Sequence, residues 1–143
     1  MPDLITTPAW ALLGFAMWTL LVLVATVGTY RWTMILARRA SIAEWRADVP
    51  QGSDWYRRAM RAHANCLESL PVYGAIVLVI VAAGIRDARL DALSIALLAA
   101  RIAHTIVHVA WTQTNAVAAV RFAFFFAQVI CMFAMAAIVV TLA

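Results

Sequence analysis

The feature that most constrains this chain is a series of four long apolar stretches separated by more polar segments. About 20 residues of α-helix cross a bilayer core about 30 Å thick. Each stretch reaches that length, and together they cover about residues 7–36, 61–84, 90–111 and 120–142. Hydrophobic residues make up 66% of the 143 residues, well above the share of about one half that is usual in a soluble domain. We therefore expect an all-α fold: a transmembrane four-helix bundle that forms a single integral membrane domain, residues 1–143.

The connections between these stretches predict the orientation of the chain in the membrane. The connection at about residues 37–60 is the longest, and it holds more arginine than acidic residues. Because arginine concentrates in loops that remain cytoplasmic, we expect this first connection to be cytoplasmic and both termini to face the other side. Only Asp3 is charged near the N-terminus, and no basic cluster of the kind that begins a signal peptide precedes the first stretch.

Charge and cysteine content exclude several classes of function. All eleven basic residues are arginine, and the net charge is +4. The arginines lie between hydrophobic stretches rather than on one soluble face, so we expect no nucleic-acid partner. Cys66 and Cys131 fall inside apolar stretches without metal-ligand spacing, and we interpret them as small buried side chains.

The second stretch carries polar residues that are expensive to place in a membrane. Arg61, Asn65 and Glu68 are spaced i, i+4 and i+7, which puts them on one helical face. A charged side chain near the bilayer centre costs about 2.5–3.5 kcal/mol on insertion scales, so such residues pair or face a polar cavity. They therefore line a site or, alternatively, form a structural ion pair such as Glu68 with Arg101.

The third stretch presents a second polar face. Arg101, His104 and His108 are spaced i, i+3 and i+7, so this face can meet that of the second stretch. For His108 alone, a packed core histidine is the alternative. Two histidines four residues apart are compatible with a metal ion, but no nearby cysteine or carboxylate supports one, and we expect no metal site. Haem held by both rings is not expected either, because the two histidines share one face.

Arg121 opens the fourth stretch, at the predicted cytoplasmic edge. One interpretation is a guanidinium that extends to lipid headgroups, and the other is a member of the same site. Several arginines, one glutamate, one asparagine and two histidines around a cavity suit an amphiphilic ligand that carries carboxylates and an amine, because arginine binds carboxylates in a bidentate manner.

Two segments resemble a known family. Residues 61–71 read RAHANCLESLP, which resembles the RAxxNxxExxP signature of the MAPEG family, the membrane-associated proteins in eicosanoid and glutathione metabolism. The arginine–histidine–histidine pattern of residues 101–108 is similar to that of the family's third helix, although His108 stands where tyrosine is usual. The resemblance covers almost the whole chain. It implies a homotrimer that binds glutathione, as co-substrate, between neighbouring subunits near the cytoplasmic face.

The resemblance also implies roles for individual residues. Arg121 would stabilise the glutathione thiolate as the catalytic residue, although its spacing from His108 is longer than in mammalian members. An arginine near the cytoplasmic end of the first helix, Arg38 or Arg31, would assist. The residues expected to bind glutathione are Arg61, Asn65, Glu68, Arg101, His104, His108 and Arg38.

These expectations favour a glutathione-dependent transferase or peroxidase of the bacterial inner membrane, acting on lipophilic electrophiles or hydroperoxides among the membrane lipids. A non-catalytic lipid-binding or scaffold protein of the same fold is the alternative. A small multidrug-type transporter is a third class, but it relies on a glutamate in its first helix, and the first stretch here has no acidic residue after Asp3.

Overall fold

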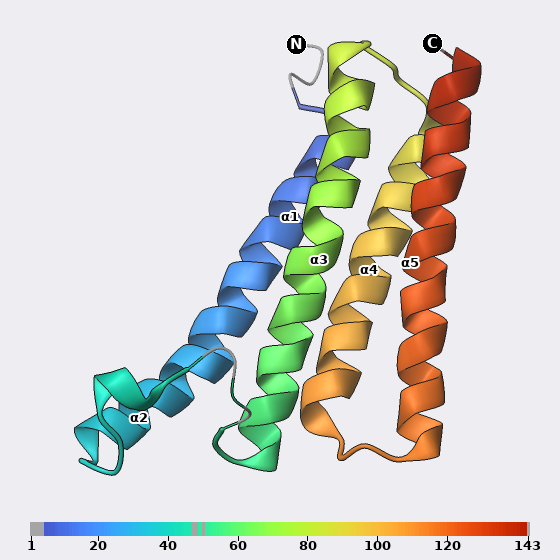
Figure 1. Cartoon of the computed structure of the whole chain (residues 1–143). Helices are drawn as coiled ribbons and strands as arrows, with labels where there is room; N and C mark the ends of the chain where they lie inside the picture. Colours follow the sequence, from blue (N-terminus) through green and yellow to red (C-terminus); the bar gives the residue numbers. More distant parts are fainter. Residues whose placement is uncertain (1–4, 47–48, 50, 143) are drawn as a thin grey trace.

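The computed structural model describes residues 5–46, 49 and 51–142, so Asp3 lies outside the described residues. Over these ranges the chain forms helices and turns without a strand. Four helical spans among the described residues are long and apolar enough to cross a membrane. The predicted all-α fold with four membrane-spanning helices is therefore confirmed. Figure 1 shows α3, α4 and α5 side by side, with the start of α1 and the end of α5 at the same end of the bundle.

The first span is one continuous helical rod of three segments: α1 (Thr7–Val22), the π-helix η1 (Leu23–Gly28) and α2 (Thr29–Leu36). The side chain of Thr6 caps α1 by accepting a hydrogen bond from the backbone N–H of Ala9. In Figure 1 this rod lies against α3 in its first part and diverges from the other helices towards α2.

The helix α3 (Asp54–Ala82) begins earlier than the predicted boundary near residue 61. Ser53 caps it, because the Ser53 side chain accepts a hydrogen bond from Tyr56 N at 3.2 Å. The preceding Gly52 has φ 75°, a conformation that favours glycine. The first turns of α3 are polar, so the apolar pattern did not include them. A short 3-10 helix, η2 (Ile42–Glu44), lies in the first connection.

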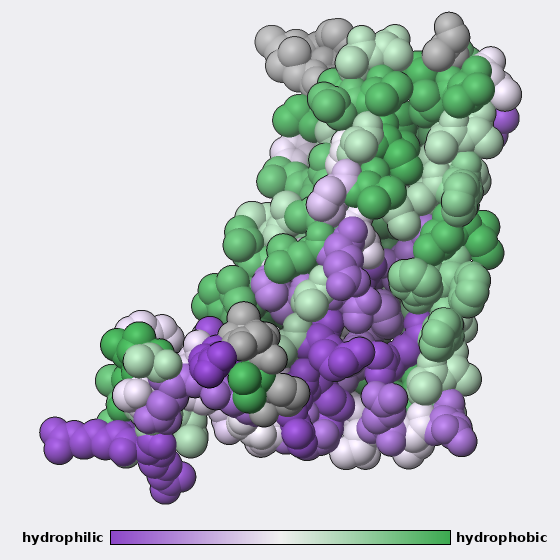
Figure 2. Space-filling model, in the orientation of Figure 1, coloured by the Kyte–Doolittle hydropathy of each residue, from purple (hydrophilic) through white to green (hydrophobic). Residues whose placement is uncertain are grey.

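The last two spans are α4 (Ala88–Ala110) and α5 (Asn115–Leu142), and α5 also begins before its predicted start near residue 120. The larger apolar core joins α1, α3, α4 and α5 and includes Phe15, stacked on Tyr73 at 6.1 Å between ring centroids. Figure 2 shows hydrophobic residues over the half of the bundle that holds the start of α1 and the end of α5. Hydrophilic residues gather in the other half, next to the first connection. Four of the residues predicted to form a site, Arg61, Asn65, His104 and Arg121, lie together near the first connection.

We predict that Ser53→Ala lowers the free energy of unfolding by about 1 kcal/mol, because it removes the side-chain cap of α3. Ser53→Asp keeps an oxygen acceptor and should retain wild-type stability. Denaturant unfolding in detergent micelles, followed by circular dichroism, measures the difference. Equal stability of the alanine and aspartate variants would contradict the capping role.

The cap of α4 predicts an acid dependence. Hydrogen bonds from the Arg89 side chain and backbone lower the pKa of Asp87 from 3.8 to about 2. Because the folded pKa is depressed, the stabilisation is present above about pH 3.8 and is lost as the pH falls towards 2. Asp87→Asn keeps a neutral cap, so its stability relative to wild type should improve over that interval. A pH-independent difference between the two proteins would contradict the prediction.

Candidate functional site

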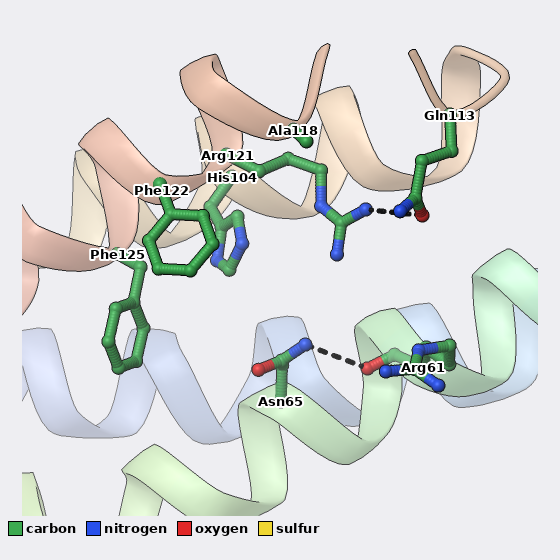
Figure 3. Close-up of a pocket in the computed structure, with 8 residues that line it drawn as sticks. All are labelled: Arg61, Asn65, His104, Gln113, Ala118, Arg121, Phe122 and Phe125. Carbon is green, nitrogen blue, oxygen red and sulfur yellow. Dashed lines mark hydrogen bonds between the residues drawn. The ribbon is translucent and has the colours of Figure 1, made fainter. Parts of the chain in front are cut away.

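A polar pocket of about 290 Å³ lies between the first half of α3, the second half of α4 and the start of α5. Figure 3 shows Asn65 and Arg61 on one side, with His104 and Arg121 facing them from the other. The residues that line it, hereafter the polar pocket, are Arg61, Asn65, His104, Gln113, Ala118, Arg121, Phe122 and Phe125.

Helix α3 provides Arg61 and Asn65, one turn apart on the same face, as their spacing predicted. Asn65 Nδ2 donates to the backbone oxygen of Arg61 at 3.2 Å. This bond holds the amide in place and leaves its side-chain oxygen available as an acceptor. Arg61 is an exposed cation at the pocket wall, with a guanidinium suited to a carboxylate.

Arg121 lies in the same pocket, in spite of its distance in sequence from the other site residues. Its Nη1 donates to Gln113 Oε1 at 3.2 Å, across the turn between α4 and α5. Arg121 lines the same pocket as Arg61, and no acidic residue lines the pocket wall. The wall therefore favours an anionic ligand.

His104 and Arg101 occupy successive layers of the site. His104 lines the polar pocket, and Arg101 lies behind it with 1% of its surface exposed. Arg101 Nη2 donates to Ser69 Oγ at 2.6 Å, and its Nη1 lies 3.3 Å from His104 Nδ1. In the described part of the chain no salt bridge joins Arg101 to Glu68, the structural pair considered from the sequence. The guanidinium instead connects α3 to α4 through a hydroxyl group.

His108 is buried, with 2% exposure, one helical turn from His104 and 6.0 Å away between ring centroids. Neither of its ring nitrogens has a hydrogen-bond partner among the described residues. Buried polar atoms are nearly always paired, so a histidine that only fills the core would be expected to have a partner. His108 does not line the polar pocket itself.

Glu68 lines a different cavity from Arg61 and Asn65. It lines an apolar groove of about 500 Å³ between α3 and α5, and its side chain is exposed. The residues that form this apolar groove are Glu68, Ser69, Val72, Ile76, Phe125, Val129, Met132, Phe133 and Ala136. Phe125 lines both cavities, so the apolar groove adjoins the polar pocket.

The two arginines considered at the end of the first helix lie elsewhere. Arg38 follows α2 with φ 55° and is exposed, and it does not line the polar pocket. Arg31 Nε donates to Tyr56 Oη at 2.7 Å, and its guanidinium lies 5.5 Å from the Trp45 ring. Arg31 therefore belongs to an aromatic cluster that packs the first connection against α3.

Three residues of the site were not assigned from the sequence: Phe122, Phe125 and Ser69. Phe122 lines the polar pocket and Phe125 lines both cavities, and neither was among the predicted site residues. Ser69 was not singled out, yet it holds the buried guanidinium, and its position four residues after Asn65 on the polar stripe was the available signal. Within the described ranges, no three His, Cys, Asp or Glu side chains come together as a metal site requires.

The fold and site define a class of protein: an integral membrane helical bundle with a cationic pocket at one end of the bundle. The model of the MAPEG family matches residues 7–141 of this chain, so the chain belongs to the MAPEG family. The resemblance inferred from the two motifs is thereby confirmed. Searches of curated proteins and of solved structures returned no match.

We predict that Ser69→Ala destabilises the bundle by about 1–2 kcal/mol, because it removes an acceptor from a buried guanidinium. Ser69→Thr keeps the hydroxyl group and serves as the matched control. Unfolding of both variants in the same micelles provides the comparison. An alanine variant as stable as the threonine variant would exclude a stabilising role for this bond.

Proposed function

We propose that this protein is a membrane-embedded, glutathione-dependent transferase or peroxidase that acts on lipophilic electrophiles or hydroperoxides. The observation that carries the proposal is that the polar pocket and the apolar groove adjoin each other at Phe125. A water-soluble thiol and a lipid-soluble substrate therefore have separate, neighbouring places. Bringing two such reactants together removes much of the entropic barrier to their reaction.

The chemistry of glutathione suits the residues at hand. A carboxylate of glutathione matches the guanidinium group of Arg61, and its peptide amides match Asn65. Its ammonium group matches Glu68, the carboxylate at the near end of the apolar groove. Arg61 and Glu68 are exposed in the single chain, which suits a site completed by a neighbouring subunit of a homotrimer, as we also propose.

The proposed role of Arg121 is to stabilise the thiolate. A thiol with a pKa of about 8.5 is mostly protonated at neutral pH. Lowering that pKa by one unit takes about 1.4 kcal/mol. A guanidinium about 4 Å from the sulfur contributes up to about 4 kcal/mol at an effective dielectric constant near 20. One arginine is therefore sufficient to make the thiolate the main form.

The thiolate then attacks the lipophilic substrate. With an electrophile, a carbon–sulfur bond forms. In a substitution the electron pair of the broken bond departs with the leaving group, and in an addition the displaced π electron pair moves to a neighbouring substrate atom, which is then protonated. With a hydroperoxide, the sulfur takes the terminal oxygen, the oxygen–oxygen bond breaks, and an alcohol and a glutathione sulfenic acid result after protonation. A second glutathione then reduces the sulfenic acid and yields glutathione disulfide and water.

We further propose that the protein lies in a bacterial inner membrane with the first connection in the cytoplasm. The polar pocket is at the same end of the bundle as that connection, because it is built from the start of α3, the end of α4 and the start of α5. In this orientation glutathione enters directly from the cytoplasm, and the lipophilic substrate enters from the bilayer.

We predict that Arg61→Met weakens glutathione binding at least tenfold, because it removes a charged donor from the polar pocket. Arg86→Met removes an arginine from the opposite end of the bundle, in the connection between α3 and α4, and should bind like wild type. Isothermal titration calorimetry on purified protein measures both. Arg38→Met adds a third comparison, because it weakens binding only if a neighbouring subunit brings Arg38 to the pocket.

We predict that Arg121→Met loses most of the thiolate absorbance of bound glutathione and most of the turnover, while binding persists at higher glutathione concentration. Arg121→Lys keeps a cation and should retain part of the signal. Unchanged turnover in Arg121→Met would exclude the catalytic role. Failure of the wild type to bind millimolar glutathione would reject the proposed function and favour a lipid-binding or scaffold protein.

A further inference from the structure

The contact between Arg101 and His104 links a fully buried cation to the wall of the polar pocket. Arg101 is 1% exposed and does not line that pocket, whereas His104 does. Arg101 Nη1 lies 3.3 Å from His104 Nδ1, within hydrogen-bond distance. His104 is therefore the pocket-lining side chain that Arg101 contacts directly.

The chemistry of the two side chains decides the direction of this hydrogen bond. A guanidinium has only N–H donors, no acceptor, and keeps its proton in proteins. A neutral imidazole has one nitrogen that donates and one that accepts. His104 Nδ1 faces a donor and must accept, so the ring proton resides on Nε2. An imidazolium ring would instead turn a second donor and a second positive charge towards the guanidinium.

The guanidinium cannot easily turn away from this arrangement. Its Nη2 donates to Ser69 Oγ at 2.6 Å, from the neighbouring helix α3. Its central carbon also lies 5.2 Å from the centroid of the Phe15 ring on α1. Three helices thus hold the group that sets the tautomer, and the orientation is preorganised before any ligand binds.

We propose that Arg101 is a positioning residue that holds His104 as the Nε2–H tautomer, so that His104 presents a hydrogen-bond donor to the polar pocket. Figure 3 shows the His104 ring on the same side of the pocket as Arg121, facing Asn65. His104, Arg61 and Arg121 thus line the polar pocket with hydrogen-bond donors, which recognise an acceptor group such as a carboxylate or a thiolate.

This assignment deepens the proposed function and, in its consequence for the ligand, rests on it. If the ligand is glutathione, a carboxylate or the thiolate faces His104. The ammonium group cannot lie there, since it would meet a donor. It must lie towards Glu68, the carboxylate at the entrance of the apolar groove. The tautomer thereby determines which way round glutathione binds.

The tautomer is measurable without any ligand. Nitrogen-15 NMR of protein labelled at histidine, in micelles at mildly alkaline pH, distinguishes a protonated from an unprotonated ring nitrogen. The chain has three histidines, and His104→Asn identifies the resonances of His104. We expect one tautomer, with the proton on Nε2. A proton on Nδ1 in the wild-type protein, or equal populations of the two tautomers, would overturn the proposal.

Substitutions separate positioning from simple helix packing. Arg101→Met removes the donors and should give a mixture of tautomers, whereas Arg101→Lys keeps a donor and should restore the Nε2–H form. Arg61→Met is the matched control, because it removes a pocket arginine that has no bond to His104, and its tautomer should remain that of wild type. A single Nε2–H tautomer in a folded Arg101→Met would show that Arg101 does not set it.

A glutathione titration of the same samples tests the consequence for the ligand. The donor His104 should give a shifted Nε2–H resonance on binding, and His104→Phe should weaken binding about ten- to hundredfold, as expected for one hydrogen bond to a charged acceptor. An Nε2–H tautomer without glutathione binding would support the positioning role and reject the proposed function. Glutathione binding to a protein with the proton on Nδ1 would support the proposed function and reject the positioning role of Arg101.

Discussion

The structure depends on the placement of one guanidinium inside a membrane-spanning bundle. Charged side chains inside a membrane are rare and pair with other polar groups. Arg101 contacts Ser69 of α3 through Nη2 and His104 of its own helix through Nη1, whereas its buried Nε has no hydrogen-bond partner among the described residues. These contacts turn the polar faces of α3 and α4 towards each other. The polar pocket forms where those two faces meet the start of α5.

Two contrasting environments follow from that meeting. On the side of the first connection, the helices enclose arginine, asparagine and histidine side chains, and no acidic residue lines the pocket they form. A short distance along α3 and α5 the surface becomes apolar, with Glu68 at the near end. Phe125 belongs to both, so the boundary between a polar and an apolar ligand lies at a single aromatic ring.

Much of this was predictable from the sequence, and the departures have physical reasons. The four helices follow from hydropathy and length, but α3 begins earlier than predicted because its first turns are polar. The earlier start of α5 adds Asn115 and a short apolar run to the predicted helix. Arg61 and Glu68 share a helical face, as their spacing requires. They still line different cavities, because seven residues correspond to about 10 Å along the helix axis. Sequence spacing predicts which residues share a helical face. It does not predict which of them line the same cavity, because that depends on where a neighbouring helix packs against the face.

The sequence by itself determined that the helices span a membrane, where their two polar faces lie, and which family the chain belongs to. Hydropathy, periodicity and motifs are properties of the chain alone. Only the tertiary structure decided which polar residues line the polar pocket. It placed Arg121 across the polar pocket from Arg61, left Arg38 outside that pocket, and set Arg101 behind His104. It also made Phe125 part of two cavities. These outcomes depend on the offset between packed helices, which no single helix encodes.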